Sequence, residues 1–186
     1  RVIFAELRLA LRGHQLWWYI ACCVGFIAAV FAPLGATRRI VVPLALLLPI
    51  SVWSELGARE QMYRTEELVF VGSEPIKLLA GSVGLLMTLP AGVRFAVNGQ
   101  LGAVFGWSVG LLCLPAIALA LGVWSGRPKL FEISYLTAWY LGPVNGLSHV
   151  DYLGVQDATV TSGITIGYLL LTVAALGIAV LGRRLR

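Results

Sequence analysis

An all-α, polytopic membrane protein with six transmembrane helices is the fold that this sequence predicts. Hydrophobic residues make up 59% of the 186 residues and charged residues only 12%, whereas an average soluble domain has about 45–50% and about 25%. The mean hydropathy is +0.86. A helix needs about 20 apolar residues to cross roughly 30 Å of hydrocarbon, so six long apolar runs use up most of the chain. Residues 1–186 are therefore expected to form one membrane domain, with no separate soluble domain.

The chain begins with an amphipathic stretch, residues 1–14. Arg1, Arg8 and Arg12 fall on one narrow face of a helix, while apolar side chains occupy the rest of its circumference. Such a helix is expected to lie along the membrane surface. The alternative is an N-terminal extension of the first span.

The spans follow in order, with tryptophans near several of their ends and prolines in or beside most of them. Trp53 and Trp124 are expected at the membrane interface, where amphipathic rings are favoured. The prolines predict kinked helices whose freed carbonyls are satisfied by neighbouring helices. The second and fifth spans are short. The expected spans are residues 15–34, 40–56, 78–97, 101–124, 133–147 and 163–182.

The placement of lysine and arginine predicts the orientation. With both termini in the cytoplasm, the inner segments hold eleven basic residues and the outer segments hold three. This asymmetry favours that topology, because cytoplasmic loops carry the excess of basic residues. Residues 57–77 are then cytoplasmic and residues 148–162 lie outside. The pair Arg38 and Arg39, in the first outer turn, is the one discordant feature.

The polar stretch after the second span predicts a short exposed helix. Glu55 with Arg59, and Glu60 with Arg64, are acid-first pairs four residues apart, which support a helix. Apolar residues at its far end would then stand near water, as in a helix that docks in a partner's groove. A solvated loop that merely joins two spans is the alternative. The residues expected to contact a partner are Glu55, Arg59, Glu60, Arg64, Glu66, Glu67, Leu68 and Phe70.

Three glycines at spacing four mark one face of the fourth span, Gly102, Gly106 and Gly110. Small residues at this spacing allow two backbones to approach closely. Packing within the chain and dimerisation between chains are both compatible with it. Arg94 is the one basic residue within a span. It is interpreted as a side chain that extends to water at the outer helix end, rather than as a residue on a substrate path.

The fifth span is expected to break near its end, since Gly142-Pro143 and Asn145-Gly146 are both strong turn signals. Residues 148–162, the outer segment, alternate apolar and polar side chains. The segment is therefore expected to re-enter the outer leaflet, where non-helical backbone is tolerated only against protein or a wet cavity.

Several chemistries are not supported by the sequence. The GxSxG pattern at residues 106–110 falls inside a span, although that motif acts on a strand-to-helix turn with acid and histidine partners. The three cysteines lie in apolar runs without a cysteine–histidine cluster, so no metal, cofactor or catalytic site is expected. The basic residues suit anionic lipid headgroups better than nucleic acid. The chain has no GxxxxGK[ST] phosphate-binding loop, so it is not expected to bind ATP through such a loop. If ATP drives its function, a separate subunit would have to bind it.

Four segments carry a family resemblance: residues 53–60 (WSELGARE), 64–70 (RTEELVF), 119–126 (LALGVWSG) and 139–146 (WYLGPVNG). Together with the order of elements, they resemble the permease subunit of bacterial type 2 ATP-binding cassette (ABC) transporters, most closely the C-terminal six-span half of the longer relatives. The resemblance implies that residues 57–77 form a coupling segment that docks on an ABC ATP-binding subunit. It also implies re-entrant helices in the outer segment.

The function expected from this resemblance is a transmembrane permease subunit that moves substrate across the bacterial inner membrane. The protein itself would not be an enzyme, since ATP would be hydrolysed by the separate subunit. The expected partners are that subunit, a second permease half or a second copy of the chain, and membrane lipid. A secondary carrier or channel, and a non-transporting scaffold that recruits a cytoplasmic protein, are the alternatives.

Overall fold

The computed structural model describes residues 15–55, 83–156 and 163–184. These parts are helical and contain no strand, so the predicted all-α class is confirmed. The interfacial helix expected at residues 1–14 and the coupling segment lie outside the described residues. So do the last residues of the outer segment, 157–162.

The elements follow the chain as a series of long helices joined by short irregular ones. The first group is α2 (Leu16–Phe31), α3 (Leu34–Ala36), the π-helix η1 (Thr37–Val41), α4 (Val42–Ala45) and α5 (Ile50–Glu55). The second group is α8 (Val83–Val97), α9 (Leu101–Ser125), α10 (Pro128–Trp139), the π-helix η2 (Tyr140–Val144), the 3-10 helix η3 (Ser148–Val150) and α12 (Ile164–Arg184).

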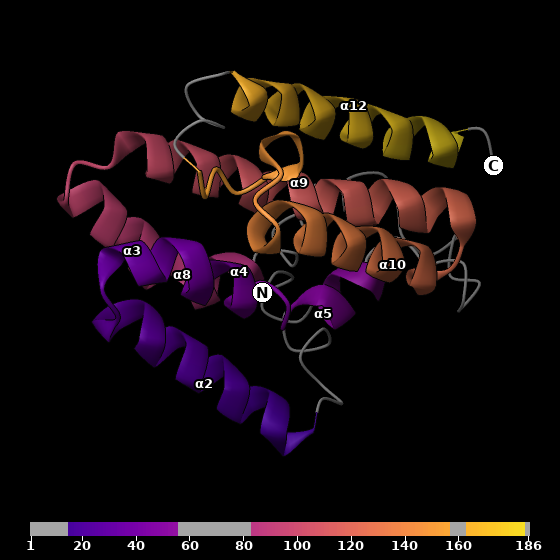
Figure 1. Cartoon of the computed structure of the whole chain (residues 1–186). Coiled ribbons are helices and arrows are strands. Elements are labelled where there is room, and N and C mark those ends of the chain that lie inside the picture. The colour runs from indigo at the N-terminus through magenta and orange to yellow at the C-terminus, as the bar shows by residue number, and fades with distance from the viewer. Residues whose placement is uncertain (1–14, 56–82, 157–162, 185–186) are drawn as a thin grey trace, which may run out of the picture.

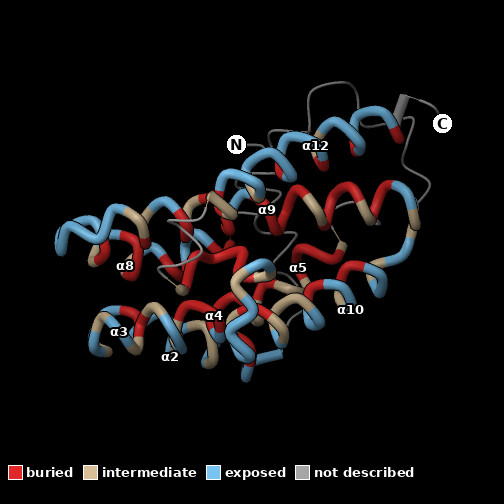
Figure 2. Tube along the Cα trace, turned by 45° about the horizontal axis from the view of Figure 1, so that its top comes forward, coloured by how far each residue is buried: buried red, intermediate tan, exposed pale blue. Residues whose placement is uncertain are grey.

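Helix α9 forms the centre of the bundle. It contacts α12 along one side, and α10, α5 and α8 on the others; α2 lies at the opposite edge, against α8 and α4 (Figure 1). Buried positions are concentrated on α9, whereas α12 exposes a continuous outer face (Figure 2). A helix that is apolar all round is suited to this central position, because most of its circumference meets other apolar elements.

The outer surface of the bundle is strongly apolar. On α12, Leu170 is 66% exposed and Val173 is 64% exposed; on α2, Leu16 is 76% exposed. A soluble protein rarely leaves such large apolar areas uncovered. Within the described residues, α9 and α12 are long and apolar enough to cross a membrane, by length and composition. Membrane association is therefore supported, while the six-span topology remains a prediction.

The second expected span is not one continuous helix. Between α4 and α5 the chain makes a tight turn, residues 46–49, in which Leu48 N donates to Ala45 O and Ile50 N donates to Leu47 O. The physical reason is Pro49: it has no N–H with which to continue the helical ladder, so Ala45 O takes a nearer donor. The interruption places several backbone carbonyls inside an apolar bundle.

Trp53, expected from the sequence at the membrane interface, faces the interior of the bundle and not its surface. Its side chain is fully buried, and its ring meets Tyr135 edge-on with the centroids 6.2 Å apart. A Cβ atom on Gly84 would lie 2.6 Å from this ring, so glycine is what admits it. Trp124, by contrast, is 53% exposed, and its indole N–H donates to Ile178 O of α12.

Candidate functional site

The described part of the outer segment, residues 148–156, packs directly on the glycine face of α9. A Cβ atom on Gly106 would lie 2.8 Å from Leu153 O and 2.9 Å from Gly154 Cα. A Cβ atom on Gly110 would lie 2.8 Å from Tyr152 O. The neighbour of this face is therefore irregular backbone of the same chain, rather than a second helix. Gly102 lies on the same helix one turn earlier and is partly buried.

The outer segment reaches well along the bundle. Gly110 lies nine residues after the start of α9 at Leu101, which corresponds to roughly 13 Å along the helix axis. Non-helical backbone enclosed in an apolar bundle has to find its hydrogen-bond partners within the protein.

Asp151 supplies two of these partners. The residue is 1% exposed, and its Oδ1 and Oδ2 accept hydrogen bonds from Val155 N at 3.0 Å and Gln156 N at 2.8 Å. From η1, Arg38 donates to Gly154 O through both Nε and Nη2, at 3.2 and 2.7 Å. The carboxylate and the guanidinium thus fix the same turn from opposite ends.

Two further elements hold the segment. A Cβ atom on Gly142 of η2 would collide with Val150 O, so only glycine permits this approach. From α12, the Tyr168 hydroxyl donates to His149 O at 2.9 Å. The outer segment is therefore in contact with η1, α9, η2 and α12.

The carbonyls released by the break between α4 and α5 receive side-chain donors from other helices. The indole of Trp139 donates to Pro43 O at 3.0 Å, the Tyr135 hydroxyl donates to Leu46 O at 2.9 Å, and the indole of Trp18 donates to Leu48 O at 2.9 Å. An aromatic ring with one polar atom suits this task, because it fills apolar space and still offers a hydrogen bond.

Tyr152 connects this break to the outer segment. Its hydroxyl donates to the Tyr135 hydroxyl at 3.3 Å, and the two ring centroids are 5.9 Å apart. Burial, followed by the neighbouring Tyr135, raises the pKa of the Tyr152 phenol well above its ordinary value. A continuous path leads from Tyr152 through Tyr135 to Trp53, which lies two residues before Glu55 at the end of α5.

Replacing Tyr135 by phenylalanine is expected to destabilise the protein by about 1–3 kcal/mol. The change leaves the buried Leu46 carbonyl without this donor and Tyr152 without its acceptor, and an unsatisfied buried polar group costs about that much. Denaturant unfolding in detergent micelles measures the effect. Tyr140→Phe is the matched control, since Tyr140 is 58% exposed; equal stability of the two variants would contradict the buried donor role.

The Arg94 side chain was expected to extend to water; the structure instead shows its guanidinium hydrogen-bonded to the end of α2 and to η1. Its Nη1 donates to Ala29 O at 2.8 Å and to Thr37 Oγ1 at 3.2 Å, and its Nη2 donates to Ala32 O at 2.6 Å. The last carbonyls of a helix have no partner within it, and a cation at that end is also favoured by the helix dipole. Arg94 therefore caps the C-terminal end of α2 from α8.

Of the residues expected to contact a partner, the structure describes Glu55 alone. It is half-buried at the end of α5, a helix that packs against α9 and α10. The fully buried Trp53 anchors this end in the bundle. The other seven expected contact residues lie outside the described residues: Arg59, Glu60, Arg64, Glu66, Glu67, Leu68 and Phe70.

A second face of small residues was missed from the sequence, on α8. Gly84, Thr88 and Gly92 follow one another at spacing four. Gly92 lies directly against the Trp107 ring, and the Trp107 indole donates to Thr88 Oγ1 at 2.9 Å. The signal was the same spacing that marks Gly102, Gly106 and Gly110, with threonine standing in for one glycine.

Comparison with known proteins adds no relative: no protein family, no curated protein and no solved structure matches the chain.

Proposed function

We propose that this chain is the membrane permease subunit of a bacterial type 2 ABC transporter. It would move a substrate across the inner membrane, with both termini in the cytoplasm, using ATP hydrolysed by a separate subunit. Two such six-span units, either two copies or two related halves, would form the transport path.

The observation that carries the proposal is the outer segment enclosed against the glycine face of α9. The family resemblance implies a re-entrant element before the last span, and residues 148–156 form irregular backbone that packs beside Gly106 and Gly110. The apolar outer faces of α2 and α12 further support a lipid environment.

The mechanism that follows uses the coupling segment as a lever. Closure of the ATP-binding subunits would displace this segment, which continues directly from α5. Because Trp53 is buried against Tyr135 and Gly84, α5 cannot move without pushing on α8 and α10. Tyr135 in turn contacts Tyr152, so the displacement would reach the outer segment and open or close the path there.

Two variants of the coupling segment test the proposal. The double change Arg59→Glu with Glu60→Arg reverses the charges expected to set the register, and Phe70→Ala removes an expected anchor. Losing one aromatic anchor is expected to cost about 2 kcal/mol of binding, which is roughly a thirtyfold loss of affinity. The measurement is co-purification with the proposed ATP-binding subunit, followed by ATP-driven transport in reconstituted vesicles.

Lys129→Glu is the matched control, since Lys129 is 77% exposed at the start of α10, on the side proposed to be cytoplasmic. It is expected to leave the complex intact. Undiminished complex and transport in both coupling variants would remove the coupling role. Transport that persists without ATP would favour a carrier or channel, and a stable complex without cargo flux would favour a scaffold.

A further inference from the structure

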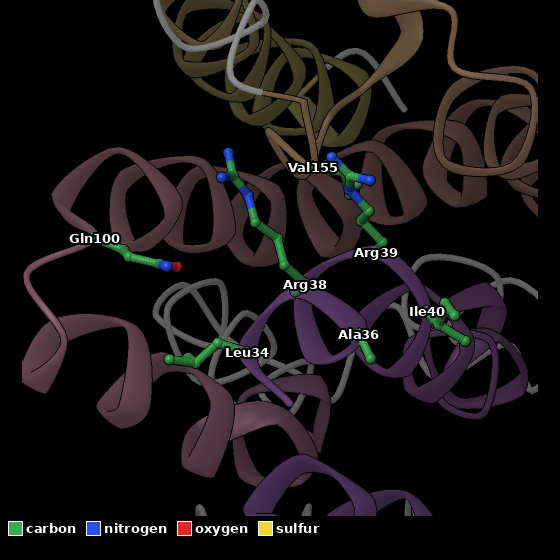
Figure 3. Close-up of a pocket in the computed structure, with 8 residues that line it drawn as sticks. Leu34, Ala36, Arg38, Arg39, Ile40, Gln100 and Val155 are labelled. Atoms are coloured by element: carbon green, nitrogen blue, oxygen red, sulfur yellow. The ribbon is translucent and has the colours of Figure 1, made fainter. Parts of the chain in front are cut away.

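A cavity of about 330 Å³ lies at the end of the bundle where α2 gives way to η1 and where α9 begins. This is the end that we propose faces outward. Figure 3 shows Arg38 and Arg39 extending from η1 toward the turn that carries Val155, with Gln100 directed inward from the start of α9. The lining residues are Leu34, Gly35, Ala36, Arg38, Arg39, Ile40, Gln100 and Val155.

Among the residues that the structure describes, the charged groups lining this cavity are cationic. They are Arg38 and Arg39, and the other described lining residues are uncharged. The nearby carboxylate of Asp151 is directed to the backbone N–H groups of Val155 and Gln156. Gln100 immediately precedes α9, so the positive end of that helix dipole lies at the rim of the cavity.

The two arginines have different roles. Arg38 is held in place by its two hydrogen bonds to Gly154 O, and it therefore forms a fixed wall. Arg39 is exposed and lines the cavity beside it. A guanidinium presents planar donors that match the oxygens of a phosphate group.

The remaining walls are apolar. Val155 is 8% exposed, whereas Ile40 is 57% exposed and faces outward beside the cavity mouth. Cationic groups next to an exposed apolar side chain match a ligand that has both an anionic and an apolar part. The same basic pair is the one feature that opposes the predicted orientation, since outer segments otherwise carry few basic residues. Binding of an anion accounts for its presence there.

We propose that this cavity binds a phosphate-bearing anion at the outer face of the membrane, with Arg39 as the principal contact. The two sources of such a group are the headgroup of an anionic phospholipid and a soluble phosphate ester. The eight lining residues belong to other parts of the sequence than the coupling segment. The inference rests on the membrane placement of the chain and does not depend on its pairing with an ATP-binding subunit.

The test is a binding measurement on the full purified chain in non-ionic detergent, with no ATP-binding subunit present. Phosphatidylglycerol, phosphatidylcholine and glycerol phosphate are titrated separately, and bound ligand is counted by native mass spectrometry. Phosphatidylglycerol is expected to bind in preference to phosphatidylcholine. Arg39→Gln is expected to reduce this preference about fivefold, the effect of losing one cationic contact at an anionic surface; Arg39→Lys is expected to restore part of it.

Arg127→Gln serves as the control, because Arg127 is exposed just before α10, away from the cavity. It is expected to leave the preference unchanged. If glycerol phosphate binds as well as phosphatidylglycerol and Arg39→Gln weakens both, the ligand is a soluble phosphate ester rather than a lipid. Three results would each overturn the site. The first is equal binding of the two lipids with no binding of glycerol phosphate. The others are an unaltered preference for phosphatidylglycerol in Arg39→Gln, or an equal loss of that preference in Arg127→Gln.

Discussion

Gly106→Val is expected to displace the outer segment and to lower the free energy of unfolding by roughly 2–4 kcal/mol. The added side chain would meet Leu153 O and Gly154 Cα. These are backbone atoms, which cannot rotate away as a flexible side chain does. The expected loss of stability is therefore at the upper end of the range for overpacked cores. The loss of this packing is also expected to abolish the proposed transport, since the segment contacts η1, α9, η2 and α12.

Two measurements check this expectation. Denaturant unfolding in detergent gives the stability. A cysteine placed at Val155, which is 8% exposed, reports displacement through its reaction with a membrane-impermeant maleimide, slow in the parent and fast in the variant. A parent without the added cysteine corrects for Cys22, Cys23 and Cys113.

Gly167→Val provides the comparison on α12, where an added Cβ atom meets no heavy atom within 4 Å. It is expected to change stability by less than about 1 kcal/mol. Should Gly106→Val be as stable as Gly167→Val and the maleimide reaction stay slow, the outer segment does not pack on the glycine face.

Arg94→Leu is expected to destabilise the end of the bundle where α2 stops by about 2–4 kcal/mol. The substitution keeps much of the apolar stem but removes the donors to Ala29 O, Ala32 O and Thr37 Oγ1. Ala32 O still accepts a hydrogen bond from the Thr37 hydroxyl at 3.2 Å, whereas the buried Ala29 O loses its Arg94 donor; an unsatisfied buried carbonyl costs about 1–3 kcal/mol, and a lost hydrogen bond to a charged group about 1.5–3 kcal/mol. Arg94→Lys is expected to recover only part of this loss, because one ammonium group cannot reproduce the planar fork that reaches both carbonyls.

The stabilities of these variants are compared by unfolding in the same detergent, together with hydrogen exchange of the last turn of α2. Faster exchange there, with α12 unaffected, is the expected local signature. Arg127→Leu removes an exposed arginine at the other end of α9 and is expected to be near neutral. If Arg94→Leu matched Arg127→Leu in both measurements, Arg94 would be a surface residue, as the sequence alone had suggested.

Much of the architecture followed from composition and spacing. Long apolar runs predicted helices, and α9 and α12 begin within one residue of the expected positions. The Gly-Pro and Asn-Gly pairs predicted the end of the fifth helix, where η2 stops at Val144. These features are local. They depend on the spacing of apolar residues and on the turn preferences of glycine, proline and asparagine, and both can be seen in the sequence directly.

The sequence by itself determined that the chain is helical and where most of its long helices lie. It also determined that α9 carries a face made of glycines, which lets another backbone approach closely. The tertiary structure alone decided what fills that face, where Arg94 places its guanidinium, and that Trp53 is buried. The physical reason is that a spacing pattern defines a face but not its neighbour. Likewise, a long polar side chain in an apolar bundle takes whichever partner the packing of distant segments brings within reach, here the end of α2 rather than water.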